Sequence, residues 1–399
     1  MGSVWIVPTI CSVSGAGFAF LVSLSCFVVK RKRSRGHRET RQLRIEGKGD
    51  VTLPMVGLKK QDDPDVDTPS ARDLSAKVTE PAGQTSGPDF EFPRDKVKLQ
   101  RVLGDGFYGQ VYEAVAEGIL HDGENTTVAV KIMKGQSSIS EFRNELEIFK
   151  ALKKHPFVVS FLGSCSEKEP FYLIMECVSY GTLEAYIRKK RLAWDEAKLA
   201  NRPVKEALNP DRILMFAYQI ACGMEYLSSM HLIHRDLATR NVLLGEGLTC
   251  KLCDFGLARD VTGTEQYKQS SGGAVPFRWL ALECLLQSTY TTKSDVWSFG
   301  VLLWELVTLG AQPYANTSFE VIIVHLQSGF RLPMPVHCGK ELYDLMSSCW
   351  HSKPESRPSF TELRKRLDYL LKSDSELLNM SRFATDQYVY QNQVAPTVC

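Results

Sequence analysis

The octapeptide HRDLATRN occupies residues 234–241, and the tripeptide DFG follows at residues 254–256, thirteen residues after Asn241. The carboxylate of Asp236 could accept the proton of a substrate hydroxyl. Asn241 and Asp254 carry oxygen atoms of the kind that bind Mg²⁺, and the ion could join them to phosphate oxygens. These residue types could therefore form an active site in which Asp236 accepts a proton and Asn241 and Asp254 bind Mg²⁺.

A glycine-rich segment, LGDGFYGQV, lies upstream at residues 103–111. Glycine allows backbone amides to approach a phosphate closely. Dinucleotide-binding folds share the G-x-G-x-x-G spacing, but in those folds a helix follows. Here residues 111–115, VYEAV, predict a strand. We therefore expect the segment to join two strands and to cover a phosphate group.

A lysine and a glutamate are expected to meet beside this loop. Residues 128–132, VAVKI, predict a strand on which Ala129 and Lys131 share one face. Residues 138–153 predict a helix with an apolar stripe at spacings of three and four residues. Glu145 falls on the inward side of that stripe, where a carboxylate needs a cation, and Lys131 is the available partner. The alternative to this pairing is that both side chains are exposed to solvent.

These motifs occur in the order of the protein-kinase signature set, and the sequence resembles protein tyrosine kinases. The resemblance is closest to the cytoplasmic halves of receptor tyrosine kinases of the fibroblast growth factor receptor type, over residues 92–371. The matching segments are EFPRD (91–95), AYQIACGMEYL (217–227), SDVWSFGVLLWE (294–305), CW (349–350) and RPSF (357–360). The resemblance implies an α+β, bilobal protein-kinase fold, with a β-rich N-lobe containing one key helix, a hinge and a helical C-lobe. The polar residues 188–210 are expected to form a surface insertion.

The resemblance also implies ATP and Mg²⁺ as cofactors, with named residues in each role. Asp236 would be the catalytic acceptor, supported by Arg240. Lys131 would hold the α- and β-phosphates, and Glu145 would orient it. The nucleotide-binding residues would be Leu103, Gly104, Asp105, Gly106, Phe107, Gly109, Val111, Ala129, Lys131, Met175, Glu176, Val178 and Leu243. In that set Met175 corresponds to the gatekeeper, and the Glu176 carbonyl and the Val178 amide would bind the adenine edge.

Tyrosine specificity is implied by Ala238, which stands where serine/threonine kinases usually carry a lysine, and by Arg240 after it. Residues 275–279, VPFRW, resemble the substrate platform of tyrosine kinases. The A-P-E motif is replaced by ALE, whose Glu283 is expected to pair with Arg357 as in the family. The expected function is transfer of the ATP γ-phosphate to protein tyrosines in signalling. A dual-specificity kinase and a pseudokinase scaffold are the alternatives.

Regulation is expected at Tyr267, the only tyrosine between the DFG motif and Glu283. A phosphate there would add negative charge, and Arg235 and Arg259 are its expected partners. Phosphorylation would thus order the activation loop and raise activity. A mobile, unmodified tyrosine is the alternative.

The C-terminal residues 372–399 have a polar composition that predicts a flexible tail. Tyr388 and Tyr390 would be accessible there. Asn392 lies two residues after Tyr390, a pattern that one type of SH2 adaptor prefers. One interpretation is therefore that an SH2 adaptor binds these tyrosines after phosphorylation. The other is that they are tail residues that are not phosphorylated.

At the N-terminus, residues 4–29 contain no charged side chain and are followed by KRKRSR at 30–35. About 20 apolar residues span a bilayer, so we expect one transmembrane helix. The positive-inside rule then places the N-terminus outside and the kinase domain in the cytoplasm. A cleaved signal peptide is the alternative, but it would need a basic start and a shorter apolar core. Residues 30–91 predict a basic juxtamembrane segment followed by a disordered linker.

Partners of several kinds follow from these features. Protein substrates with tyrosine are implied by the resemblance, and membrane lipids by the apolar and basic N-terminal segments. Gly15, Ala19 and Ser23 recur every four residues, a pattern that favours a homodimer through the membrane helix. The formal net charge of +2 argues against a nucleic-acid partner. The 11 scattered cysteines argue against a secreted disulfide scaffold.

Overall fold

The computed structural model describes residues 90–105, 109–133, 139–202, 209–269, 275–373 and 376–390. The predicted transmembrane helix 4–29 and residues 30–89 of the predicted linker lie outside these ranges. Within them, no helix combines the length and the apolar character that a bilayer crossing requires. The described residues therefore cover the predicted domain 92–371 and part of the tail.

The N-lobe is built on a five-stranded antiparallel sheet in the order β1-β2-β3-β5-β4. Its strands are β1 (Val97–Asp105), β2 (Gly109–Glu117), β3 (Asn125–Met133), β4 (Phe161–Cys165) and β5 (Tyr172–Glu176). The β1–β2 pairing confirms that the glycine-rich segment joins two strands. Val128 and Val130 pack with Ile174 in a separate apolar cluster. The opposite face of β3 is left for Ala129 and Lys131, as strand alternation requires.

One helix of the N-lobe, α2 (Ile139–Ala151), confirms the predicted helix within two residues at each end. Phe142, Leu146 and Phe149 of its apolar stripe are buried. Glu145 is also buried, on the inward side of the helix as predicted. The packing of the stripe therefore sets the direction in which the Glu145 carboxylate points.

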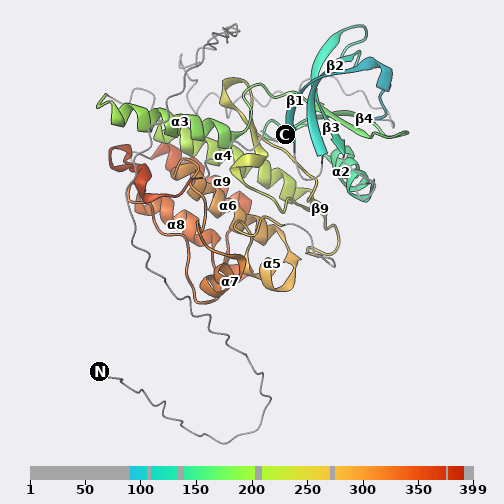
Figure 1. The fold of residues 1–399 in the computed structure, drawn as a ribbon. Coiled ribbons are helices and arrows are strands. Elements are labelled where there is room, and N and C mark those ends of the chain that lie inside the picture. The colour runs from blue at the N-terminus through green and yellow to red at the C-terminus, as the bar shows by residue number, and fades with distance from the viewer. Residues whose placement is uncertain are drawn as a thin grey trace, which may run out of the picture. The chain divides into compact units, whose positions relative to one another are not determined.

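The C-lobe is mainly helical, and Figure 1 shows its helices gathered apart from the strands of the N-lobe. The helices are α3 (Leu183–Leu199), α4 (Pro210–Ser229), α5 (Leu282–Gln287), α6 (Thr292–Val307), α7 (Phe319–Gln327), α8 (Lys340–Cys349) and α9 (Phe360–Lys372). Short strands pair as β6 (Leu232–Ile233) with β9 (Arg259–Asp260), β7 (Val242–Leu244) with β8 (Cys250–Leu252), and β10 (Tyr267–Lys268) with β11 (Thr289–Tyr290). Single 3₁₀ turns are η1 (Arg94–Lys96), η3 (Thr239–Asn241), η4 (Glu246–Leu248), η5 (Pro354–Ser356), η6 (Met380–Arg382) and η7 (Thr385–Gln387).

Helix α6 forms the centre of the C-lobe, because every residue from Ser294 to Val307 is buried. A helix that is apolar on most of its circumference must be surrounded by other elements. Its N-terminus is closed by a capping box between Thr291 and Ser294. At Gly300 a Cβ atom would lie 2.6 Å from Trp350 Nε1, so only glycine permits this close approach. The few polar residues of α6 therefore need partners inside the lobe.

The predicted surface insertion 188–210 is wrong in its first half, because α3 continues to Leu199. Ile187, Lys190, Arg191 and Trp194 are buried along one side of this helix. The Arg191 guanidinium lies 3.8 Å from the centre of the Tyr390 ring. Long basic side chains can bury their aliphatic stems in this way. A segment rich in charged residues can therefore still form part of a packed helix.

The predicted flexible tail also differs from the structure, because residues 376–390 pack on the C-lobe. The Phe383 ring is buried and lies 5.5 Å from the ring of Trp194. The Tyr388 ring lies 6.0 Å from that of Trp304, and burial raises the pKa of Tyr388 to about 12. Aromatic contacts with distant helices thus outweigh the polar composition of the segment.

Tyr390 is held at the end of this segment by three neighbouring contacts. Its hydroxyl donates to the Thr308 carbonyl at 3.0 Å, and the Arg191 guanidinium covers its ring. The amide of Gln312 donates to the carbonyl of Val389 at 2.8 Å. Burial raises the pKa of Tyr390, with Arg191 opposing the shift. Tyr388 and Tyr390 are therefore half-buried and packed on the C-lobe, and not freely accessible as predicted.

Replacing Tyr390 with phenylalanine is expected to lower the free energy of unfolding by about 1 kcal/mol, because one hydrogen bond to a carbonyl is lost. Urea denaturation would measure the change. Tyr369→Phe is the matched control, since Tyr369 is 71% exposed. Equal stability of the two variants would contradict the packed position of Tyr390.

Candidate active site

Three charged side chains meet between the sheet and the C-lobe. The Lys131 ammonium lies 2.8 Å and 2.9 Å from the two carboxylate oxygens of Glu145. It also donates to Asp254 Oδ1 at 2.9 Å. The predicted pairing of Lys131 with Glu145 is therefore confirmed, and the solvent-exposed alternative is wrong.

Burial and charge act in opposite directions in this cluster. Lys131 is 4% exposed, and burial alone would lower its pKa, but the carboxylates of Asp254 and Glu145 outweigh burial and raise it. Burial raises the pKa of Glu145, with Lys131 opposing the shift. Burial also acts to raise the pKa of Asp254, but here Lys131 prevails and the pKa falls. The lysine is thus held as a cation, and Asp254 is held as an anion.

The loop that carries Asp236 is fixed by contacts within the motif itself. Arg240 donates to the Asp236 carboxylate. The Asn241 side-chain amide donates to the Asp236 carbonyl at 2.7 Å. These contacts bring together three of the predicted catalytic and metal-binding residues, with Arg240 and Asn241 in η3 and Asp236 just before it.

A carboxylate from α6 supports the same loop. Asp295 accepts the backbone amides of His234 at 2.7 Å and Arg235 at 2.9 Å. Burial raises the pKa of Asp295 to about 6, although His234 and these amides oppose the shift. Arg235 has a φ of 68°, and the Asp295 contacts hold this strained conformation. No motif in the sequence assigns a role to Asp295, although a carboxylate in so apolar a helix signals a buried partner.

The predicted nucleotide-binding residues lie on neighbouring strands of the sheet and on β7. In the pairing register, Ala129 lies opposite Met175, and Val111 lies opposite Lys131. Leu243 forms an isolated bridge with Thr182, at the start of α3. The other described members are Leu103, Gly104, Asp105, Gly109, Glu176 and Val178, whereas Gly106 and Phe107 lie outside the described residues. The register therefore places Val111, Ala129 and Met175 on the same face of the sheet as Lys131.

Gly109 has a structural reason to be glycine in addition to any contact with phosphate. A Cβ atom at this position would lie 2.3 Å from the carbonyl oxygen of Ile132. Backbone atoms of β3 cannot give way as a flexible side chain could. The close approach of β2 to β3 therefore requires glycine here.

Comparison with known proteins agrees with this geometry. A model of the protein tyrosine and serine/threonine kinase family matches residues 97–367, more than half of the chain. The chain belongs to this family. The Drosophila melanogaster tyrosine kinase receptor Cad96Ca is 40% identical over 311 residues, which cover 77% of this chain and 40% of that protein. The Bombyx mori tyrosine-protein kinase receptor torso is 39% identical over 351 residues, which cover 78% of this chain and 42% of that protein.

The chain spans about two fifths of the length of these curated relatives. The family match identifies residues 97–367 as a protein kinase domain, and this domain is similar to those of two tyrosine kinase receptors. The bilobal α+β fold predicted from the motifs is the fold observed.

In this kinase domain Tyr267, the tyrosine between the DFG motif and Glu283, lies beside two arginines. The Tyr267 ring centre is 4.6 Å from the Arg235 guanidinium and 5.2 Å from that of Arg259. Tyr267 also pairs with Tyr290 between β10 and β11. Arg235 is buried, and its Nε has no hydrogen-bond partner among the described residues. An unused donor therefore lies next to the tyrosine predicted to be phosphorylated.

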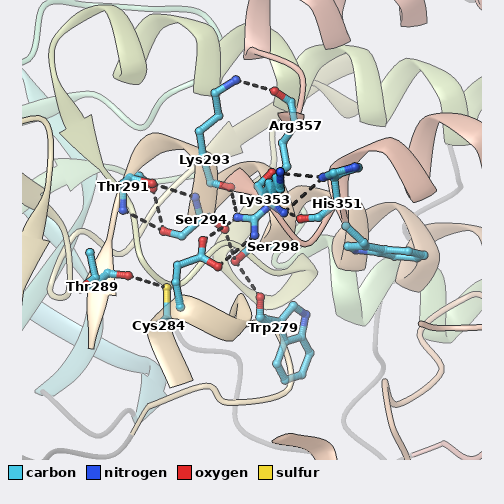
Figure 2. Close-up of polar contacts among 12 residues, drawn as sticks. Trp279, Cys284, Thr289, Thr291, Lys293, Ser294, Ser298, His351, Lys353 and Arg357 are labelled. Carbon is cyan, nitrogen blue, oxygen red and sulfur yellow. Dashed lines mark hydrogen bonds and ion pairs between the residues drawn. The ribbon is translucent and has the colours of Figure 1, made fainter. Parts of the chain in front are cut away.

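The kinase domain also contains the predicted ion pair between Glu283 and Arg357. Two guanidinium nitrogens donate to the two carboxylate oxygens, at 2.6 Å and 2.9 Å. Arg357 further donates to the carbonyls of His351 and Lys293, both at 2.9 Å (Figure 2). The change from A-P-E to A-L-E thus leaves this bidentate pair intact.

Proposed function

We propose that the chain is a membrane-anchored, receptor-like tyrosine kinase that transfers the γ-phosphate of ATP to tyrosines of signalling proteins. The observation that carries the proposal is the buried cluster of Lys131, Glu145 and Asp254 beside the loop of Asp236. A pseudokinase has no need to maintain such a costly buried cluster together with an intact catalytic loop.

The residues of the loop would divide the chemistry between them. Asp236 would accept the proton of the substrate phenol as its oxygen attacks the phosphorus atom. Arg240 and Lys131 would supply positive charge to the transferring phosphoryl group. Glu145 would keep Lys131 in place, as the observed bidentate contact does.

Asn241 and Asp254 would hold Mg²⁺, which would neutralise charge on the phosphate oxygens. The Asn241 amide nitrogen is bonded to the Asp236 carbonyl, which leaves the carboxamide oxygen for a cation. Asp254 is ionised, as a magnesium ligand must be. The described residues hold no group of three or more His, Cys, Asp or Glu at metal-binding positions. The remaining ligands would therefore come from phosphate and water, which is usual for Mg²⁺.

ATP would lie against the face of the sheet that carries Ala129 and Lys131. Leu103, Val111, Ala129 and Leu243 would contact the adenine, and the Glu176 carbonyl and the Val178 amide would bind its edge. The Glu176 carboxylate is occupied elsewhere, with the Ser160 amide at 2.6 Å and Lys251 at 2.9 Å. We also propose that the domain is of the fibroblast growth factor receptor type. This part of the proposal rests only on the sequence segments that resemble those receptors, such as residues 91–95 and 217–227.

Matched peptides that differ only in tyrosine or serine at the acceptor position test the function. We expect the full chain with Mg-ATP to phosphorylate the tyrosine peptide and not the serine peptide. Comparable phosphorylation of both would favour a dual-specificity kinase. Nucleotide binding without phosphorylation of either would favour a pseudokinase.

Anchoring in the membrane is proposed from residues 4–29 and the basic residues that follow them. A dimer through Gly15, Ala19 and Ser23 would bring two kinase domains together for phosphorylation in trans. Replacing Gly15 and Ala19 with isoleucine should then reduce self-association in a membrane reporter assay. Unchanged association would remove this part of the proposal.

Docking of an SH2 adaptor at Tyr388 or Tyr390 requires an additional step. Both rings contact the C-lobe, and the Tyr390 hydroxyl is bonded to Thr308. The segment would have to detach before either tyrosine could enter an active site or bind an SH2 domain. Docking is therefore proposed only for the detached tail.

Replacing Tyr267 with phenylalanine is expected to lower turnover several-fold, because the activating phosphate cannot form. A phosphate would add about −1.5 to −2 charge and could use the free Nε of Arg235. Initial rates before and after phosphatase treatment would measure the effect. Phosphatase should slow the wild-type kinase and leave Tyr267→Phe unchanged. Equal turnover of the two proteins before treatment would contradict a regulatory role for Tyr267.

A further inference from the structure

Glu305 is a buried carboxylate of α6 that lies between the catalytic loop and the substrate platform. Its oxygens accept from the Thr239 hydroxyl at 3.0 Å and the Thr239 amide at 3.3 Å. One of them also accepts from Trp279 Nε1 at 2.8 Å. Thr239 precedes Arg240 in η3, and Trp279 ends the segment 275–279. A single side chain therefore joins two segments that are separated by 40 positions in the sequence.

A second connection joins the same two segments on the substrate side. The Arg240 guanidinium lies 4.3 Å from the centre of the Trp279 ring, which is a cation–π contact. Arg240 also donates to the carboxylate of Asp236. The contacts thus form a closed ring from Glu305 through Trp279 and Arg240 back to Thr239. A closed ring restricts Arg240 more strongly than either contact alone.

Helix α6 also holds the backbone of the platform. The Ser298 hydroxyl donates to the Trp279 carbonyl at 2.8 Å (Figure 2). Asp295, Ser298 and Glu305 lie on one side of α6, within the arc set by 100° per residue. Asp295 fixes the loop before Asp236, and Glu305 fixes the loop after it. The rigid helix therefore sets the position of the platform relative to the catalytic carboxylate.

We propose that Glu305 is a positioning residue that holds the substrate platform in register with the catalytic loop through Trp279 and Thr239. It touches neither the phosphoryl group nor Asp236, and it acts through Arg240 on the approach of the substrate tyrosine. The inference rests on the proposed tyrosine kinase function and adds a determinant of substrate placement. Nucleotide binding does not depend on this ring, because Lys131, Glu145 and Asp254 lie outside it.

The test uses Glu305→Met and Trp279→Phe in the full chain. The first keeps the approximate length of the side chain but removes both acceptor oxygens. The second keeps a ring against Arg240 but removes the indole N–H. Each is expected to lower kcat/KM for a tyrosine peptide about 10-fold, because small displacements of reacting groups have effects of this order. The KM for ATP should stay within about twofold of the wild-type value.

The double variant distinguishes the loss of one positioning contact from a non-specific loss of structure. Both substitutions remove the same hydrogen bond, so the double variant should be no slower than the slower single variant. Trp304→Phe is the matched control, because it removes an indole hydrogen bond of the same helix, to the Pro333 carbonyl at 3.1 Å. It should leave kcat/KM within about twofold of wild type.

Three results would overturn the inference while leaving the kinase function in place. They are unchanged kcat/KM in Glu305→Met, losses that multiply in the double variant, or an equal loss in Trp304→Phe. If Glu305→Met fails to fold, Trp279→Phe decides by the same comparison with Trp304→Phe. A wild-type chain that phosphorylates no tyrosine peptide would instead overturn both the function and the inference.

Discussion

The Asp236→Asn variant is expected to lose tyrosine phosphorylation by about 10²–10⁴-fold, the usual contribution of a positioned proton acceptor. Asparagine has the same size as aspartate but cannot accept the phenolic proton. The Asn241 contact to the backbone carbonyl of residue 236 does not involve the altered group, so the loop should keep its position. Steady-state phosphorylation of a tyrosine peptide would measure the loss.

Nucleotide affinity provides the control for this experiment. Lys131, Glu145 and Asp254 do not contact the Asp236 side chain in any hydrogen bond found among the described residues. Binding of Mg-ATP, measured by calorimetry, should therefore stay close to that of the wild type. A variant that keeps most of its activity would exclude Asp236 as the acceptor. A variant that loses ATP binding as well would show a folding defect.

Replacing Glu283 with alanine is expected to lower the free energy of unfolding by about 3–5 kcal/mol, the range for breaking a buried ion pair from one side. The Arg357 side chain is 0% exposed and that of Glu283 is 13% exposed. The guanidinium would keep its contacts with the carbonyls of His351 and Lys293 (Figure 2) but lose both hydrogen bonds to its one charged partner. An uncompensated buried charge would remain in the C-lobe.

The Lys340–Asp344 pair on α8 provides the matched comparison. Its side chains are 80% and 50% exposed, so solvent screens the attraction. Asp344→Ala should change the free energy of unfolding by less than about 1 kcal/mol. Equilibrium urea unfolding of both variants would give the two values. Similar values for Glu283→Ala and Asp344→Ala would show that the pair at Glu283 adds little to stability.

Local patterns were sufficient to predict most of the active site. Strand alternation placed Lys131 on the face opposite Val128 and Val130, and the stripe of α2 placed Glu145 inward. The order of the glycine loop, HRD and DFG motifs carried the resemblance to protein kinases, and that resemblance implied the fold class. The placements of Lys131 and Glu145 succeeded because each depends on the periodicity of one element.

Predictions that depended on composition were less successful. Residues 188–199 are polar, yet α3 continues through them because Lys190 and Arg191 bury their stems. Residues 376–390 are also polar, but Phe383 and Tyr388 reach aromatic residues of α3 and α6. In both cases the stabilising surface comes from a distant part of the chain. Composition within a segment carries no information about that surface.

The sequence by itself identified this chain as a protein kinase, because the glycine-rich, HRD and DFG motifs occur in the order that the family shares. Only the tertiary structure decided how the catalytic groups are held. Asp295 and Glu305 belong to a helix that is apolar over most of its length. Their partners in the catalytic loop lie 60 or more residues earlier, and Glu305 has a further partner in Trp279 of the substrate platform. A buried carboxylate must have donors, but which donors it finds depends on how α6 packs in the C-lobe.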